Sequence, residues 1–202
     1  MKKFTILLCA FFLTAGFSIK NANASPVWAT DAIWQAGDNA TPGSSRGLLE
    51  NALYEPDDDF LSLGLGGYAI FDFGMEFAST AIIFETTWGS RDAHYEEAEV
   101  WVAGADFDFD YWRDNLDQNM PDMFSFAGVI DNQQEMSMID LSVASDSPFR
   151  YIAIKDNTLD SRKDGFDINA VGVEPVPEPS TVFLLSIGLI GTAVLRKKFN
   201  FI

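Results

Sequence analysis

Residues 149–155 read Phe-Arg-Tyr-Ile-Ala-Ile-Lys, a run in which the larger apolar side chains recur at every second position. Such a period of two places alternate side chains on opposite faces of an extended chain, so the run predicts a β-strand. Further strands are predicted by similar apolar stretches, separated by Gly, Asp and Asn, at residues 68–73, 81–85, 99–103, 124–130, 136–143 and 166–173. Seven or eight strands of this length predict an all-β fold, an antiparallel β-sandwich.

The segment between two of these strands admits two interpretations. Acids at Asp106, Asp108, Asp110, Asp114 and Asp117 match positions 1, 3, 5, 9 and 12 of an EF-hand loop. Against a calcium loop, residue 111 is Tyr where the sharp turn needs Gly, and the last acid is shorter than the usual Glu. We favour a strand with Phe107 and Phe109 on one face, followed by a short helix at residues 111–116.

The front of the chain has the pattern of a secretory signal peptide. Lys2 and Lys3 precede an apolar run at residues 4–17, and Ala22-Asn23-Ala24 forms a small-residue cleavage site. We therefore predict a signal peptide at residues 1–24, cut between Ala24 and Ser25. The single cysteine, Cys9, lies inside it, so disulfides, thiolate metal sites and thiol nucleophiles are excluded from the exported part.

The other end of the chain has the pattern of a membrane anchor. Prolines at 175, 177 and 179 predict an extended stalk over residues 175–180. Residues 181–195 carry no charge, and a helix of that length spans roughly 22 Å, enough for a short transmembrane helix. Arg196, Lys197 and Lys198 then place residues 196–202 in the cytoplasm and everything before the stalk outside.

Charge separates the exported part from its two ends. Between these ends, residues 25–174 are long enough for one domain with a core of its own. This part holds seven Lys and Arg against 29 Asp and Glu, a net charge of −22. Such a surface repels nucleic acid and anionic lipid and attracts divalent cations. The aromatic content of 14% argues against disorder.

The end of the chain resembles a known sorting signal. Pro177-Glu178-Pro179, the apolar span and the basic end resemble the PEP-CTERM signal of Gram-negative bacteria that make exopolysaccharide. The resemblance implies recognition by an exosortase, residence in the inner membrane before cleavage near the motif, and then a place at the cell surface or in the extracellular matrix. The same segment is also labelled the ice-binding protein C-terminal domain, but the chain has no regular Thr-x-Thr array that would indicate ice binding.

The exported region resembles a second family in the order of its elements. The stretches that carry the resemblance are residues 62–67, 71–73, 83–85, 97–102, 151–156 and 164–171. They are similar to those of secreted bacterial jelly-roll domains of the galactose-binding-like type, over residues 61–173. This resemblance implies a structural calcium ion and glycan binding.

Two sets of residues are candidates for these sites. Glu85, Asp156 and Asp167 end or follow predicted strands, where their carboxylates could converge on Ca²⁺; the alternative is that such acids cap turns. Trp88 and Trp112 lie in predicted loops and are the candidates for stacking on sugars, with core packing as the alternative.

Catalysis has little support in the sequence. The one histidine, His94, lies in a polar loop, and no nucleophile elbow, histidine pair or phosphate-binding loop occurs. We therefore expect no enzyme. The sequence favours an exosortase-sorted protein with a structural or adhesive role associated with exopolysaccharide, and the alternative is a carbohydrate-binding module, with or without calcium dependence.

Overall fold

The computed structural model describes residues 25–87, 90–91, 94–144, 148–160, 163–175 and 188. The strands in this part are β1 (Val27–Trp28), β2 (Asp31–Gln35), β3 (Leu61–Ser62), β4 (Tyr68–Glu85), β5 (Glu97–Ala103), β6 (Ser125–Asp131), β7 (Met136–Asp140), β8 (Phe149–Asp156) and β9 (Asp167–Pro175). Helix α2 (Phe109–Asn115) and two 3₁₀ turns, η1 (Leu49–Ala52) and η3 (Leu141–Val143), complete them. All strand pairs are antiparallel, so the predicted all-β sandwich is confirmed.

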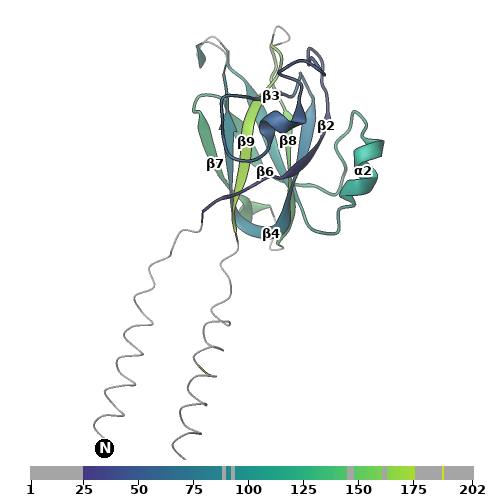
Figure 1. Cartoon of the computed structure of the whole chain (residues 1–202), viewed down its shortest axis with the longest axis vertical. Helices are drawn as coiled ribbons and strands as arrows, with labels where there is room; N and C mark the ends of the chain where they lie inside the picture. The colour runs from purple at the N-terminus through teal and green to yellow at the C-terminus, as the bar shows by residue number, and fades with distance from the viewer. Residues whose placement is uncertain are drawn as a thin grey trace, which may run out of the picture.

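Strand β4 belongs to both layers of the sandwich. Its first half pairs with β2 and β8, and its second half pairs with β9 and β7. One layer is therefore β2-β4-β8-β5-β6, and the other is β1-β9-β4-β7 with β3 on β9. Figure 1 shows β4 curving through one end of the molecule to join the layers.

The sequence predicted two separate strands here, at 68–73 and 81–85, and that prediction was wrong. The residues between them interrupt the apolar pattern, with Gly74, Glu76 and Ser79 facing solvent or a turn. The strand register shifts between Asp72 and Phe77, and Gly74 has a φ of 67°. An irregularity of this kind bends a strand sharply without ending it, which a pattern of side chains cannot reveal.

The main core lies between the two layers. In β8 the side chains of Ile152 and Ile154 point into it, and they meet Phe71 and Ile83 of β4 and Val171 of β9. All five are fully buried. Burying each such side chain stabilises the fold by about 1.5–3 kcal/mol relative to leaving it in water.

The outer face of the β8 layer is covered as well. Tyr151 and Ala153, the alternate residues of β8, pack in a second cluster with Phe107 and Phe109, from the segment that follows β5. The two phenylalanines share one cluster as expected, but the strand predicted for them does not form. Residue 107 lies in a turn, and helix α2 begins at Phe109 because the Asp108 carboxylate accepts a hydrogen bond from the Tyr111 amide at 3.1 Å.

The predicted targeting segments lie outside the described residues. These are the signal peptide at 1–24, the motif at 177–179, the basic cluster at 196–198 and, apart from Gly188, the apolar span at 181–195. In the part that is described, no helix has the length and apolar character needed to cross a membrane.

Candidate functional site

Many strand ends meet at one end of the sandwich, which we call the loop end. Strands β4, β6 and β8 finish there, and β5, β7 and β9 begin there. The antiparallel register brings the end of one strand next to the start of its neighbour. Asp156 lies opposite Ala98, Asp131 opposite Glu97, and Glu85 opposite Ile168. Polar residues that flank separate strands in the sequence are thereby gathered into one region.

Four acidic side chains are buried at the loop end. Glu85, Asp156 and Asp167, the predicted metal ligands, are 2–3% exposed, and Glu96 is 3% exposed. Glu96 was not among the predicted ligands. It has the same parity as Ala98, Val100 and Val102, the buried residues of β5, so the period-two pattern of that strand could have placed it inward.

The carboxylate of Asp156 accepts hydrogen bonds from backbone amides. It accepts hydrogen bonds from Gly66 at 2.9 Å, from Phe166 at 2.9 Å and from Thr158 at 3.3 Å. Burial raises its pKa, while these donors oppose the rise. Asp156 therefore ties together the loops before β4, after β8 and before β9.

The carboxylate of Glu85 is held by side chains. Its two oxygens accept hydrogen bonds from the Thr87 hydroxyl at 2.7 and 2.8 Å, and Arg91 pairs with one of them at 2.5 Å. Burial raises the pKa of Glu85, and Thr87 and Arg91 oppose that rise.

The other two buried acids keep an oxygen without a partner. Oε2 of Glu96 and Oδ1 of Asp167 make no hydrogen bond. Burial, followed by the charges of neighbouring acids of which Asp167 is the strongest, raises the pKa of Glu96 to about 8. Burial also raises the pKa of Asp167 to about 7, although Arg46 lies 3.5 Å away and favours its charged form.

These acids share the loop end but do not fit a calcium site on their own. Calcium takes six to eight oxygen ligands. The oxygens of Asp156 and Glu85 are already engaged by amides, Thr87 and Arg91. Among the residues that the structure describes, no three acidic, histidine or cysteine side chains converge closely enough to hold a metal ion. Calcium binding by Glu85, Asp156 and Asp167 stays a prediction.

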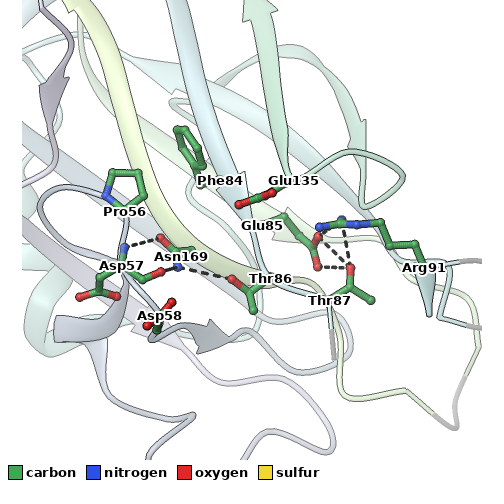
Figure 2. A pocket seen from close by; sticks show the side chains of 10 residues that line it. All are labelled: Pro56, Asp57, Asp58, Phe84, Glu85, Thr86, Thr87, Arg91, Glu135 and Asn169. Carbon is green, nitrogen blue, oxygen red and sulfur yellow. Dashed lines mark hydrogen bonds and ion pairs between the residues drawn. The ribbon is translucent and has the colours of Figure 1, made fainter. Parts of the chain in front are cut away.

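An acidic pocket of about 400 Å³ opens beside Glu85. Figure 2 shows Asp57 and Asp58 on one side of it, Glu85, Thr87 and Arg91 on the other, and Asn169 and Thr86 between them. Pro56, Phe84 and Glu135 complete the lining. We call this cavity the acidic pocket.

A second cavity of about 300 Å³ lies at the same end, and we call it the tyrosine pocket. Its lining residues are Tyr95, Glu97, Asn157, Thr158, Leu159, Asp160 and Lys163. Tyr95 is 49% exposed and Leu159 is 95% exposed. Glu97 accepts hydrogen bonds from the Tyr95 hydroxyl at 3.1 Å and from the Asn157 amide at 2.7 Å, which fixes the polar side of the pocket.

Asn132 holds the segment between the two pockets. Its side chain is fully buried and accepts a hydrogen bond from the Glu96 amide at 3.1 Å. The same side chain donates to the His94 carbonyl, and Arg91 of the acidic pocket donates to the Asn132 carbonyl. His94 in turn contacts Lys163 of the tyrosine pocket, 3.0 Å between Nδ1 and Nζ.

The predicted sugar-stacking residues have different outcomes. Trp88 lies outside the described residues. Trp112 is half-buried on α2, where it packs against the second cluster and stacks on Phe107 with 6.4 Å between ring centres and 14° between ring planes. Tyr95, which was not predicted from the sequence, is an exposed residue in the lining of the tyrosine pocket.

Comparison with known proteins identifies the end of the chain. The model of the PEP-CTERM protein-sorting motif matches residues 175–198. The chain carries a PEP-CTERM sorting motif. It is therefore a protein sorted to the cell envelope or exported by way of an exosortase, as the resemblance implied. The comparison with curated proteins found no match.

Solved structures identify the fold. The F5/8 type C domain of a Bacteroides fragilis protein superposes with a TM-score of 0.51 at 9% identity, covering 77% of this chain and 99% of that one. Reduced XRCC1 bound to the DNA polymerase β catalytic domain gives 0.50 at 12% identity, covering 75% and 99%. The CBM32 of AlyQ in complex with 4,5-unsaturated mannuronic acid gives 0.44 at 14% identity, covering 74% and 98%. The first of these superpositions, together with the antiparallel strand pairing, shows that the described region has the predicted jelly-roll β-sandwich fold.

Some similar chains are much longer than this one. The chain spans 25% of the length of a fucosidase of Ruminococcus gnavus, with a TM-score of 0.46 at 14% identity over 73% of this chain. These likenesses describe the fold, and one fold supports many unrelated functions.

Proposed function

We propose that this protein is an exported surface protein that adheres to extracellular polysaccharide through its tyrosine pocket. The observation that carries the proposal is the half-exposed ring of Tyr95 beside a fixed pair of polar groups, Glu97 and Asn157, in a cavity at the loop end. A flat apolar surface next to ordered hydrogen-bonding groups suits a sugar ring, which has apolar C–H faces and a polar rim.

The delivery of the protein supports this role. The sorting motif at 175–198 takes the chain to the cell envelope or beyond, where polysaccharide is the abundant polymer in bacteria that make it. The net charge of −22 between the two targeting segments makes nucleic acid an unfavourable partner. Exosortase is the partner that the sorting motif implies.

The hydrogen bonds of one buried acid support binding rather than turnover. Glu85, the buried acid that lines the acidic pocket, has both oxygens engaged by Thr87 and Arg91, so it is poorly placed to exchange protons with a substrate. The expectation that the protein is not an enzyme stays a prediction. Release of reducing ends or unsaturated products from a polysaccharide panel would contradict it.

The proposal is tested by binding of the full chain, purified in mild detergent, to exopolysaccharide from the producing cells. Tyr95→Ala should weaken binding by about tenfold to a hundredfold, as expected when a central aromatic contact is lost. Tyr111→Ala is the matched control, because Tyr111 is a similarly exposed tyrosine on α2, away from both pockets. Equal binding by the two variants would exclude the tyrosine pocket as the site.

A further inference from the structure

We infer that the free edge of β7 receives an extended, cationic segment of a partner protein, which adds a strand to the layer β1-β9-β4-β7. The inference goes beyond the proposed function, because it concerns a different surface and a different class of partner. Three observations carry it: an unpaired strand edge, an apolar groove beside that edge, and charges of one sign around both.

Two strands with unpaired edges lie side by side. Strands β6 and β7 are the last strands of their layers and contact each other along one side of the sandwich. Among the described residues, β6 pairs only with β5 and β7 only with β4. Figure 1 shows β7 at the outer margin of the sandwich. A strand paired on one side presents a row of N–H and C=O groups on the other, which is a template for another extended chain.

The edge of β7 lacks several features by which proteins protect a free edge, such as a bulge, a proline or a lysine. The register of β6 against β5 shifts beside Gly128, so β6 has an irregular edge. In β7 all five residues, Met136–Asp140, stand one to one opposite residues of β4, and none of them is proline or lysine. Five residues is the length of an ordinary strand. Strand β7 therefore offers the regular edge of the two.

A groove of about 260 Å³ lies beside this edge. Its apolar lining comes from both strands, with Val129 and Ile130 of β6 and Met136 and Met138 of β7. Val129, Met136 and Met138 are 49%, 41% and 59% exposed. Methionine is flexible and polarizable, and it is frequent on surfaces that bind varied peptides. Because alternate side chains of an added strand point to the same face, the groove favours a partner with apolar residues at every second position.

The charges around the groove have one sign. From residue 114 to residue 149 the chain contains seven Asp and Glu and no Lys or Arg. Glu135 precedes β7 and Asp140 ends it. Arg91, which contacts the turn between β6 and β7, is already paired with Glu85 at 2.5 Å. A partner strand that carries Lys or Arg would meet opposite charge at both ends of β7.

The same charges disfavour a second copy of this protein as the occupant. Two β7 strands paired edge to edge would bring Glu135 and Asp140 of both copies to one interface, between domains that each carry a net charge of −22. Like charges across a strand pair are destabilising. A peptide also suits the edge better than a glycan does, because another extended backbone matches the spacing of its N–H and C=O groups.

The experiment measures binding of labelled eight-residue peptides to the full chain in mild detergent, by fluorescence anisotropy at low and high salt. One peptide alternates Lys and Val, a second alternates Glu and Val, and a third is the Lys–Val peptide with N-methyl groups on two successive central amides. Successive amides point to opposite edges of a strand, so this methylation blocks both edges. We expect the Lys–Val peptide to bind at least about tenfold more tightly than either other peptide, and high salt to weaken it.

A pair of variants assigns the binding to the edge. Met138→Lys places a lysine on β7 and should weaken binding of the Lys–Val peptide by about tenfold or more. Tyr111→Lys is the matched control, because Tyr111 is similarly exposed but lies on α2, and it makes the same change in charge. Thermal unfolding of both variants checks that each is folded.

Hydrogen exchange of the wild-type protein locates the peptide without any substitution. Binding of the Lys–Val peptide should slow exchange of amides in β7. Amides of β2, another strand that pairs on one side only in the described chain, should exchange as before.

The results that would overturn the inference are distinct from one another. Equal binding of the methylated peptide would exclude strand addition, and equal binding of the Glu–Val peptide would exclude a cationic partner. Equal losses in Met138→Lys and Tyr111→Lys, or unchanged exchange in β7, would show that the peptide binds through net charge alone. Self-association of the wild type that Met138→Lys abolishes would assign the edge to a second copy.

Discussion

At the scale of single residues, the least ordinary feature is the group of buried acids at the loop end. Glu96 has an oxygen without a partner and neighbours of like charge, and its pKa is raised from 4.5 to about 8. The folded state therefore holds this proton more tightly than the unfolded chain does. Its contribution to the free energy of unfolding is complete below pH 4.5 and is lost as the pH rises through about 8.

We predict that Glu96→Gln flattens this pH dependence. The amide is uncharged and can donate to the neighbouring carboxylates, so the variant should gain stability at pH 8 relative to wild type. Each unit of pKa shift corresponds to about 1.4 kcal/mol, so the gain should be on the order of a few kcal/mol. Denaturant unfolding across pH 5 to 8 measures it. Parallel pH profiles for wild type and variant would show that Glu96 titrates normally.

Part of this group was named from the sequence as a candidate calcium site, which stays a prediction. Glu85, Asp156 and Asp167 were expected near one another because each flanks a strand, and antiparallel register does bring them to one end. Tyr95 was missed because it lies in a polar stretch without periodicity, and Glu96 was missed because the strand predicted at 99–103 begins three residues later than the alternating burial does. Trp112 was expected in a loop, but it lies on helix α2 and packs against the second cluster.

At the scale of elements, β4 decides the architecture because it passes from one layer to the other. Gly74 lies at its bend with a φ of 67°, and its amide donates to the Asp72 carboxylate at 2.8 Å. Asp72 is also held by two hydrogen bonds from Arg150 of β8, at 3.0 and 2.9 Å. The bend is thus fastened to the neighbouring strand.

We predict that Gly74→Ala destabilises the fold by about 1 kcal/mol through backbone strain alone. A Cβ atom at this position would meet no other atom within 4 Å, so steric crowding does not contribute. Gly74→Asn is the matched variant and should cost less, because Asn tolerates the left-handed region better. Thermal unfolding of both variants measures the difference; equal losses would argue against strain as the cause.

The strands were largely predictable, and their connections were not. Alternation in 149–155 identified β8, but both of its faces are buried, one between the layers and one under residues 107–124. Burial of the outer face of β8 depends on contacts with residues far away in the sequence, which the local pattern does not show. The strand predicted at 106–110 is absent for the same reason. Phe107 and Phe109 do pack in one cluster, but the first lies in a bend and the second begins helix α2.

At the scale of the whole molecule, the excess of acids raises the question of divalent ions. Two of the three predicted calcium ligands are already satisfied by amides, Thr87 and Arg91. We therefore predict that calcium raises the midpoint of thermal unfolding no more than magnesium at equal ionic strength. A rise of several degrees with calcium alone, reversed by a chelator, would establish a specific site.

Sorting gives a second prediction at this scale. The motif at 175–198 implies processing by an exosortase. Replacing Pro177, Glu178 and Pro179 with alanine should leave the protein uncleaved in the inner membrane, while substitution of the exposed Glu76 should leave processing intact. Fractionation of the producing cells, followed by mass measurement of the protein, tests both. Normal cleavage of the alanine variant would show that the motif is not the signal.

The most direct test of the account as a whole is where the Tyr95→Ala variant is found in cells that make the polysaccharide. The account predicts that the variant is exported and cleaved like wild type but appears in the medium, while wild type and Tyr111→Ala stay in the matrix fraction. If Tyr95→Ala remains in the matrix in the same proportion as wild type, the tyrosine pocket does not hold the protein there, and the central claim is contradicted.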